Sequence, residues 1–365
     1  MAATRCFPAL RAPRACAPLR GRLTCPSRAR SSCPQAPAPI RLRGRAGSCG
    51  AMRPDPARRC DGDADKRPGH HCQEGRGMKR ILITGARGYL ASLARLYNAG
   101  SYEFSCISHT DVDFHDPVGV EEFFRAADFD VCLHMAADAT TAHCEQDPDG
   151  THRVNTESAI AIARACAERG RRVVFISTEQ CFNASPGPAP FSEDDEQVST
   201  TRYGQQKMEA DAWIRENVDD YLILRFSWMF GLAMPGVRPS PNILTNVMRV
   251  LRSGEPAAFR VHERRNMTYA QRFAGQLPQI LELPSGAYHF ASQNGRTTYE
   301  TARLVAERLG CPAGEVDRLV LPDETTYADR PRDFRLASDK IQAAGIELGT
   351  FEEDLDLCLG DFGLR

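Results

Sequence analysis

The chain has 365 residues, of which 42% are hydrophobic and 25% charged, as is ordinary for a globular protein. Its formal net charge of −1 gives no overall positive field for nucleic acid or an anionic membrane, and no apolar run approaches the roughly 18 residues of a membrane span. A chain of this length forms one large or two modest domains. The seven cysteines after Met78 are scattered, which predicts reduced thiols and a cytoplasmic protein rather than a disulfide framework.

Residues 1–77 differ in composition from the rest of the chain. Between Met1 and Arg53 there are eleven arginines, no lysine and no acidic residue, so we expect a disordered extension. Three interpretations compete: an organellar transit peptide, a basic arm that binds nucleic acid, and translated sequence upstream of a true start at Met78. We favour the third, because Met78 stands just ahead of the first predicted strand. Four residues could be drawn as a metal site, but without a folded frame we expect no metal there: Cys60, His70, His71 and Cys72.

After Met78, a predicted strand at 81–83 runs into a glycine turn and then a helix to about Asn98. Gly85 and Gly88 would let backbone amides approach a pyrophosphate, and the start of the helix would present unpaired N–H groups. Ala91 replaces the third glycine of the dinucleotide fingerprint with another small residue. This pattern predicts a nucleotide cradle, although many strand-to-helix turns contain glycine for backbone reasons alone.

Apolar strands and helices alternate along the next hundred residues. Because the strands are nearly continuous apolar runs, the sequence predicts an α/β fold: a doubly wound, parallel-sheet Rossmann domain at 78–231. A smaller C-terminal substrate-binding lobe, interleaved with late strands of the sheet, is expected at 232–365. The predicted strands are 104–107, 130–137, 172–178 and 287–290; the predicted helices are 118–126, 155–168, 242–251 and 298–309, with a loop before about Gly150.

Hydroxyl groups and a lysine suggest the chemistry. Ser177 and Thr178 end a predicted strand, and Tyr203 precedes Lys207 by four residues, which places both on one face of a helix. A nearby ammonium would lower the pKa of the phenol and suit it to acid–base catalysis. Such pairs also occur on solvated helix faces, so the preceding strand and glycine turn are needed to favour the catalytic interpretation.

These features, with several further motifs, resemble the extended short-chain dehydrogenase/reductase family, and within it the dTDP-4-dehydrorhamnose reductase (RmlD-like) branch. The resemblance implies that Thr178, Tyr203 and Lys207 are catalytic, with Tyr203 protonating the carbonyl oxygen of a 4-keto sugar nucleotide. It also implies that Trp228 lies near the nicotinamide and the sugar. The motifs are Thr84-Gly-Ala-Arg-Gly-Tyr-Leu-Ala91, His134-Met-Ala-Ala137, Val154-Asn-Thr156, Ile176-Ser-Thr-Glu-Gln-Cys-Phe182, Tyr203-Gly-Gln-Gln-Lys207, Leu224-Arg-Phe-Ser-Trp-Met-Phe-Gly231 and Arg330-Pro-Arg332.

The expected cofactor is NADPH, with NADH as the alternative. The second strand ends in Ser108-His109-Thr110 without the acid that binds an NAD ribose, while Arg87 in the glycine turn suits a 2′-phosphate. By resemblance, Asp116 closes the adenine pocket. The predicted cofactor-binding residues are Gly85, Arg87, Gly88, Tyr89, Leu90, Asp116, Ala136, Ala137, Tyr203 and Lys207, and the predicted substrate-binding residues are Ser177, Glu179, Trp228 and Arg332.

Departures from the branch leave the substrate open. Gln180 stands where an aromatic residue is usual, and Asn183-Ala184 replaces an Asp-Gly turn. The alternatives to a reductase are an epimerase or dehydratase, for which Glu179 is the hint, and a non-catalytic NADP-binding regulatory subunit. A homodimer is a candidate assembly, but the sequence does not determine the oligomeric state. His134 is predicted to be a core residue, and Arg264-Arg265 and Arg330-Pro-Arg332 to be either solvated or phosphate contacts.

Overall fold

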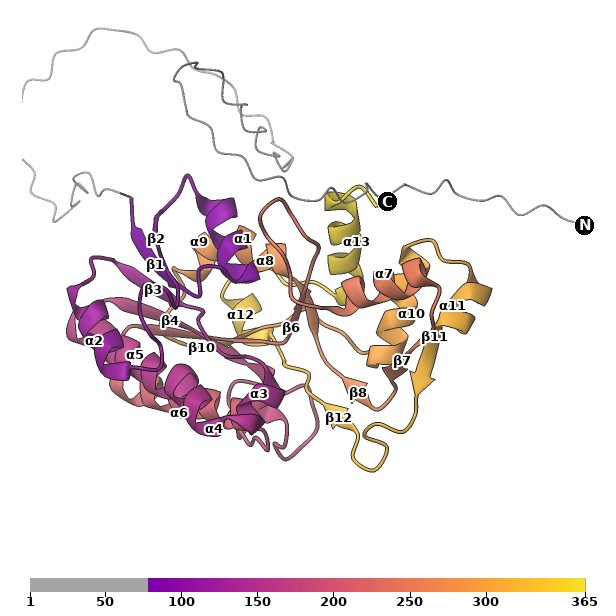
Figure 1. Ribbon diagram of the computed structural model, residues 1–365, viewed down its shortest axis with the longest axis horizontal. Coiled ribbons are helices and arrows are strands. Elements are labelled where there is room, and N and C mark those ends of the chain that lie inside the picture. Colours follow the sequence, from indigo (N-terminus) through magenta and orange to yellow (C-terminus); the bar gives the residue numbers. More distant parts are fainter. Residues whose placement is uncertain (1–77, 365) are drawn as a thin grey trace, which may run out of the picture. The chain divides into compact units, whose positions relative to one another are not determined.

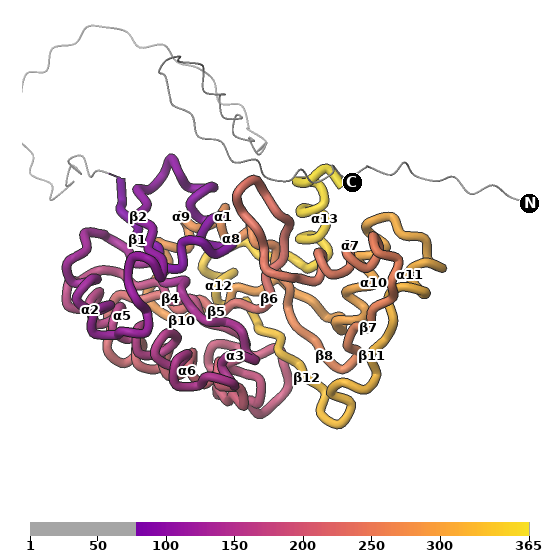
Figure 2. The backbone as a smooth tube through the Cα atoms, in the orientation of Figure 1, coloured from indigo at the N-terminus to yellow at the C-terminus, as the bar shows by residue number. Residues whose placement is uncertain are grey.

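The computed structural model describes residues 78–364 (Figures 1 and 2). The predictions made for residues 1–77, including the disorder, the transit peptide and the four metal-site candidates, lie outside the described residues.

A six-stranded parallel sheet forms the centre of this part of the chain, as predicted. Its strand order is β10-β5-β4-β3-β1-β2, and every neighbouring pair is parallel. The chain leaves β1 toward β2 and then crosses back to β3, so the strand order reverses beside β1, where doubly wound sheets bind ligands. The strands are β1 (Arg80–Thr84), β2 (Glu103–Ile107), β3 (Val131–His134), β4 (Arg172–Thr178), β5 (Tyr221–Phe226) and β10 (Gly286–Phe290).

Helices cover both faces of the sheet, because alternate side chains of each strand point to opposite faces. Ile81 and Ile83 of β1 join the core on one face, and Leu82 joins the core on the other. The first core includes residues of α1 (Tyr89–Asn98), α8 (Ala270–Gly275), α9 (Leu277–Ile280) and α12 (Asp339–Ala343), and the second includes residues of α2 (Pro117–Ala126), α5 (Ser158–Glu168) and α6 (Arg202–Asn217) (Figure 1).

The segment after β3 departs from the prediction. The strand ends at His134 rather than at 137, because the backbone amides of Met135 and Ala136 both donate to Thr84 Oγ1, at 3.0 Å each. The predicted loop contains two short helices, α3 (Thr141–Gln146) and α4 (Pro148–His152). The predicted helix at 155–168 begins as a π-helical turn, η1 (Arg153–Glu157).

A second lobe with its own hydrophobic core follows β5. Three short parallel strand pairs support it: β6 (Trp228–Phe230) with β9 (Met267–Tyr269), β7 (Ala257–Arg260) with β11 (Val320–Asp323), and β8 (Glu263–Arg264) with β12 (Arg332–Asp333). None of the helices between residues 78 and 364 combines the length and apolar character that crossing a bilayer requires. The helices of this lobe are α7 (Ile243–Ser253), α10 (Thr298–Arg308), α11 (Ala313–Leu319) and α13 (Phe351–Asp361).

His289 of β10 is fully buried against a charged pair in the core. Its Nε2 accepts a hydrogen bond from Arg225 at 3.3 Å, and its Nδ1 lies 3.1 Å from the carbonyl oxygens of Phe191 and Ala337. Since arginine only donates, the imidazole is neutral with its proton on Nδ1. Burial and the neighbouring Arg225 lower the pKa of His289 to about 3.

We therefore expect His289 to make folding sensitive to mild acid. Its pKa in the unfolded chain is about 6.5, so between pH 6.5 and pH 3 the unfolded state binds the extra proton and the free energy of unfolding falls as pH falls. The slope is about 1.4 kcal/mol per pH unit. Urea unfolding of a His289→Gln variant from pH 7 to pH 4 should show a shallower dependence by about this amount. The exposed His115→Gln is the control, and an unchanged slope in His289→Gln would contradict the expectation.

Candidate active site

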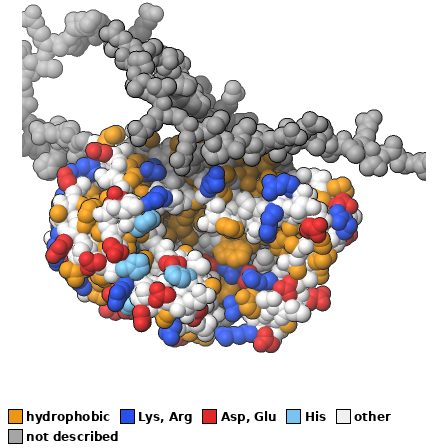
Figure 3. All heavy atoms as spheres, viewed as in Figure 1, with side chains coloured by type: hydrophobic (Ala, Val, Ile, Leu, Met, Phe, Trp, Pro, Cys, Tyr) orange, Lys and Arg blue, Asp and Glu red, His pale blue; other side chains and the backbone are white. Residues whose placement is uncertain are grey.

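A cleft of about 750 Å³ opens between the carboxyl ends of the sheet strands and the second lobe. Figure 3 shows hydrophobic side chains gathered in the hollow at this place. Many predicted site residues line it, from segments far apart in the sequence: Gly85, Gly88, Tyr89, Leu90, Ser177, Thr178, Glu179, Tyr203 and Trp228. The cleft is also lined by residues that were not predicted from the sequence, including Met135, Thr140, Pro239, Ser240, Asn242 and Asn246.

The glycine turn has the form of a phosphate cradle. Gly85 has φ +64°, and a Cβ there would lie 2.9 Å from the backbone nitrogen of Ala136, so both conformation and space require glycine. Gly88 caps α1 without any side-chain hydrogen bond to the first turn of the helix. The backbone amides at the start of α1 are therefore free to meet an anion.

Arg87 extends from the glycine turn across the end of β2. Its Nη2 lies 3.3 Å from Thr110 Oγ1 and 3.4 Å from Ser108 Oγ. The carboxylate of Asp111 accepts hydrogen bonds from the backbone amide and the hydroxyl of Ser108, at 2.8 Å each. These hydrogen bonds lower the pKa of Asp111. This end of the strand thus presents a guanidinium and hydroxyls to solvent.

Thr178 and Tyr203 approach the cleft from different elements. Thr178 ends β4, and its hydroxyl accepts from the Gln180 amide (3.2 Å) and donates to Glu179 Oε2 (3.3 Å). Tyr203 lies in the first turn of α6, whose start is capped by the side chain of Thr201. The predicted helix placement of Tyr203 and Lys207 is confirmed.

The predicted lowering of the Tyr203 pKa by Lys207 is wrong. Burial, followed by the negative charge of Glu179, raises the pKa of Tyr203 instead of lowering it. The Lys207 ammonium lies 3.8 Å from the centre of the Phe175 ring, and burial lowers its pKa to about 7. Helical spacing brought the two residues to one side of α6, but the environment of each decides its pKa.

Six predicted site residues lie outside the lining of the cleft. Ala136 touches the glycine turn through its backbone, Asp116 is exposed at the N-terminus of α2, and Arg332 stacks on Tyr327 with 3.9 Å from Cζ to the ring centre. The other three are Arg87, Ala137 and Lys207. His134 is a buried core residue, as predicted: its Nδ1 bonds Thr84 Oγ1 at 2.8 Å, and burial followed by Lys207 lowers its pKa to about 3.

Asn155 is a polar residue whose role the sequence did not reveal. From the π-helical turn, its side chain accepts from the Asp138 amide (2.8 Å) and donates to the Asp138 carbonyl and to Gln206 Oε1 (both 2.9 Å). It ties the segment after β3 to α6, the helix that carries Tyr203. The motif Val154-Asn-Thr156 was the only signal for it in the sequence.

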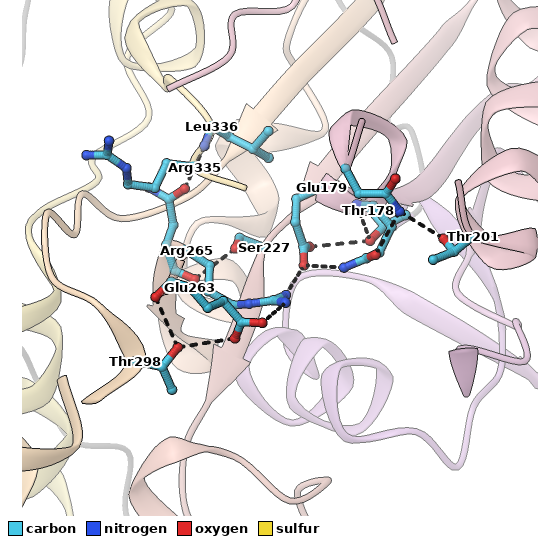
Figure 4. Close-up of polar contacts among 12 residues, drawn as sticks. Thr178, Glu179, Thr201, Ser227, Glu263, Arg265, Thr298, Arg335 and Leu336 are labelled. Carbon is cyan, nitrogen blue, oxygen red and sulfur yellow. Dashed lines mark hydrogen bonds and ion pairs between the residues drawn. The ribbon is translucent and has the colours of Figure 1, made fainter. Parts of the chain in front are cut away.

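A buried charge network at the cleft corrects the prediction for Arg265. Its side chain is only 5% exposed and pairs with Glu179 at 2.7 Å and Glu263 at 3.0 Å (Figure 4). It is therefore neither solvated nor free, whereas its neighbour Arg264 is exposed. Burial raises the pKa of Glu179, and the charge of Arg265 opposes that shift.

A second cavity of about 320 Å³ adjoins the cleft in the second lobe. Trp228, Ile243 and Asn246 line both cavities. Its charged lining residues are Arg249, Arg260 and Asp323, and Arg260 is paired with Glu263 at 3.1 Å. Within residues 78–364, no group of three or more histidine, cysteine, aspartate or glutamate side chains is arranged to hold a metal ion.

The chain resembles known proteins over most of its described length. It is 25% identical over 279 residues to the spore coat polysaccharide biosynthesis protein SpsK of Bacillus subtilis, covering 76% of this chain and 96% of that protein. It is 26% identical over 279 residues to dTDP-4-dehydrorhamnose reductase of Escherichia coli, covering 72% and 90%. A solved dTDP-4-dehydrorhamnose reductase from Bacillus anthracis in complex with NADP has the same fold, with a TM-score of 0.69, 21% identity, and coverage of 79% and 100%. The RmlD substrate binding domain family matches residues 78–363, and the chain belongs to that family, as its motifs predicted.

Proposed function

We propose that the protein is an NADPH-dependent reductase of a nucleotide-linked 4-keto-6-deoxy sugar, with Tyr203 as the general acid. One observation carries the proposal: the glycine turn and the free start of α1 open into the same 750 Å³ cleft as the hydroxyls of Thr178 and Tyr203. The relative from Escherichia coli is named dTDP-4-dehydrorhamnose reductase, and that name supports a nucleotide-linked keto sugar as the class of substrate.

The residues of the cleft fit a dinucleotide. The space at Gly85 admits no side chain, the first-turn amides of α1 suit a pyrophosphate, and Arg87 suits a 2′-phosphate. When bound, the nicotinamide supplies the hydride that reduces the ketone. We assign the ribose to Lys207, whose ammonium would have to leave the face of Phe175.

The chain itself supplies a proton and its placement. Tyr203, a phenol that is protonated at neutral pH, gives its proton to the ketone oxygen as that oxygen becomes an alcohol. Thr178 orients the same oxygen by a hydrogen bond, for which its hydroxyl turns away from Glu179. Trp228 bounds the sugar, and the smaller cavity, with Arg249, takes the nucleoside diphosphate.

The two alternatives predict different behaviour. A dehydratase or epimerase that used Glu179 as acid or base would need a free carboxylate, but Glu179 is paired with Arg265. A regulatory subunit would bind NADP without turnover.

The test uses the full chain with NADPH and a dTDP-4-keto-6-deoxy sugar, following the absorbance of the reduced nicotinamide. Stoichiometric oxidation of NADPH with formation of the 4-hydroxy sugar supports the reductase. Binding of NADPH without turnover of several 4-keto sugar nucleotides would refute it and favour the regulatory subunit.

Arg87 gives a prediction about the cofactor. Replacing it by alanine should weaken NADPH about 10- to 100-fold, because a charge-assisted contact to the 2′-phosphate is worth about 1.5–3 kcal/mol. NADH lacks that phosphate, so its dissociation constant should change less than about threefold. Fluorescence titration of both cofactors measures the effect. Arg95→Ala, on the following helix α1, is the control, and equal losses for both cofactors would contradict the assignment.

A further inference from the structure

Arg265 is held by two aromatic rings and by two carboxylates that bind its terminal nitrogens, while its Nε has no hydrogen-bond partner within the described part of the chain. Its guanidinium carbon lies 4.1 Å from the centre of the Trp228 ring and 4.5 Å from that of Phe334. In addition, Nη1 donates to Glu179 and Nη2 to Glu263. A planar guanidinium suits this arrangement, because it can stack on aromatic rings while donating hydrogen bonds in its own plane.

The positive charge of Arg265 is balanced by two neighbouring carboxylates. Glu179 and Glu263 are 3% and 0% exposed, so little water screens their interaction with the arginine. Glu263 also accepts a hydrogen bond from Arg260 at 3.1 Å. Burial alone would raise the pKa of Glu263, but the charges of Arg265 and Arg260 outweigh burial and hold that pKa below its ordinary value. Arg265 is therefore not available to bind a phosphate of a ligand.

The network connects the two cavities. Glu179 directly follows Thr178 at the end of β4, while Arg260 lines the second cavity. Figure 4 shows Arg265 in the middle, pointing between Glu179 and Glu263. Trp228, which stacks on Arg265, lines both cavities.

We propose that Arg265 is a positioning residue that fixes the Trp228 ring at the junction of the two cavities. Trp228 is 36% exposed and lines both cavities, while Arg265 lies over its ring. A fixed ring sets the width of the junction where a sugar would meet its diphosphate. This consequence for substrate binding rests on the proposed function, whereas the positioning of the ring does not.

The first test measures Trp228 itself. The chain has two tryptophans, so a Trp213→Phe background makes Trp228 the only fluorophore of this type. In that background, Arg265→Met should raise the acrylamide quenching constant about twofold and lower the fluorescence anisotropy, because the ring has lost its stacking partner. Arg264→Met, on the adjacent exposed residue, is the matched control. Unchanged quenching and anisotropy in a folded Arg265→Met protein would overturn the proposal.

A second variant, Arg265→Lys, keeps the proposal testable if Arg265→Met does not fold. Lysine keeps the positive charge between the two glutamates but has no planar group to stack on the Trp228 ring. It should also mobilise Trp228, by less than Arg265→Met. If Arg265→Met does not fold and Arg265→Lys leaves Trp228 as rigid as in the parent, the proposal fails.

The second test is kinetic. With the sugar nucleotide, Arg265→Met should raise KM about tenfold and change kcat less than about threefold, since substrate placement rather than proton transfer is lost. The dissociation constant of NADPH should stay within about twofold. A mobile Trp228 with unchanged KM would overturn the role in substrate binding. Absence of turnover in the unaltered chain would instead refute the proposed function, and the fluorescence test would still decide the position of the ring.

Discussion

Replacing Tyr203 by phenylalanine is expected to lower kcat by about 10²- to 10⁴-fold, the usual contribution of a positioned general acid. The ring would still line the cleft, so the substitution removes the hydroxyl alone. Neither Ser177 nor Thr178 replaces it, because an aliphatic hydroxyl is a much weaker acid than a phenol. Tyr89 also lines the cleft, but its hydroxyl donates to the carbonyl of Leu232 at 3.1 Å.

Steady-state kinetics and NADPH titration together test this expectation. The dissociation constant of NADPH should rise less than about tenfold, because the cofactor loses at most one hydrogen bond of about 0.5–1.5 kcal/mol. Tyr97→Phe, an exposed tyrosine of α1, is the control for removal of a phenol. If the Tyr203→Phe variant retains more than about a tenth of kcat, Tyr203 is not the general acid.

The parts of the site that the sequence predicted depend on local patterns. Apolar strands, the glycine turn and the spacing of Tyr203 and Lys207 are each contained within a few residues, and the sheet brings their ends to one edge. Gly85 illustrates this, because its positive φ is a property of its own backbone.

The parts that the sequence missed depend on tertiary contacts. Arg265 and Glu179 are 86 residues apart, and nothing near either residue in the chain indicates the pair. The pKa of Tyr203 was mispredicted for a related reason: spacing gives proximity to Lys207, whereas burial and the charge of Glu179 come from the assembled fold. Asn155 likewise bonds Asp138 and Gln206, which lie 17 and 51 residues away in the chain.

Arg225→Met is expected to lower the free energy of unfolding by about 3–5 kcal/mol, because it leaves a charge buried without its main partner. Arg225 and Asp211 are 0% and 1% exposed and share two hydrogen bonds, at 3.0 and 3.2 Å. The pair joins β5 to α6, and the only other ion-pair partner of Asp211 among residues 78–364 is Arg215, at 4.0 Å.

Urea unfolding of a double-mutant cycle shows how much of the lost stability comes from leaving Asp211 buried without its partner. Arg225→Met combined with Asp211→Leu should restore most of the loss, because an apolar pair of similar volume has no desolvation cost. The exposed pair Arg318 and Glu315 provides the contrast, since Arg318→Met should leave the urea midpoint of unfolding nearly unchanged. If the double variant is as unstable as Arg225→Met alone, the loss arises from packing and from the hydrogen bond to His289, and not from a stranded carboxylate. Because α6 also carries Tyr203 and Lys207, the single variant should lose turnover at a lower urea concentration than the double variant does.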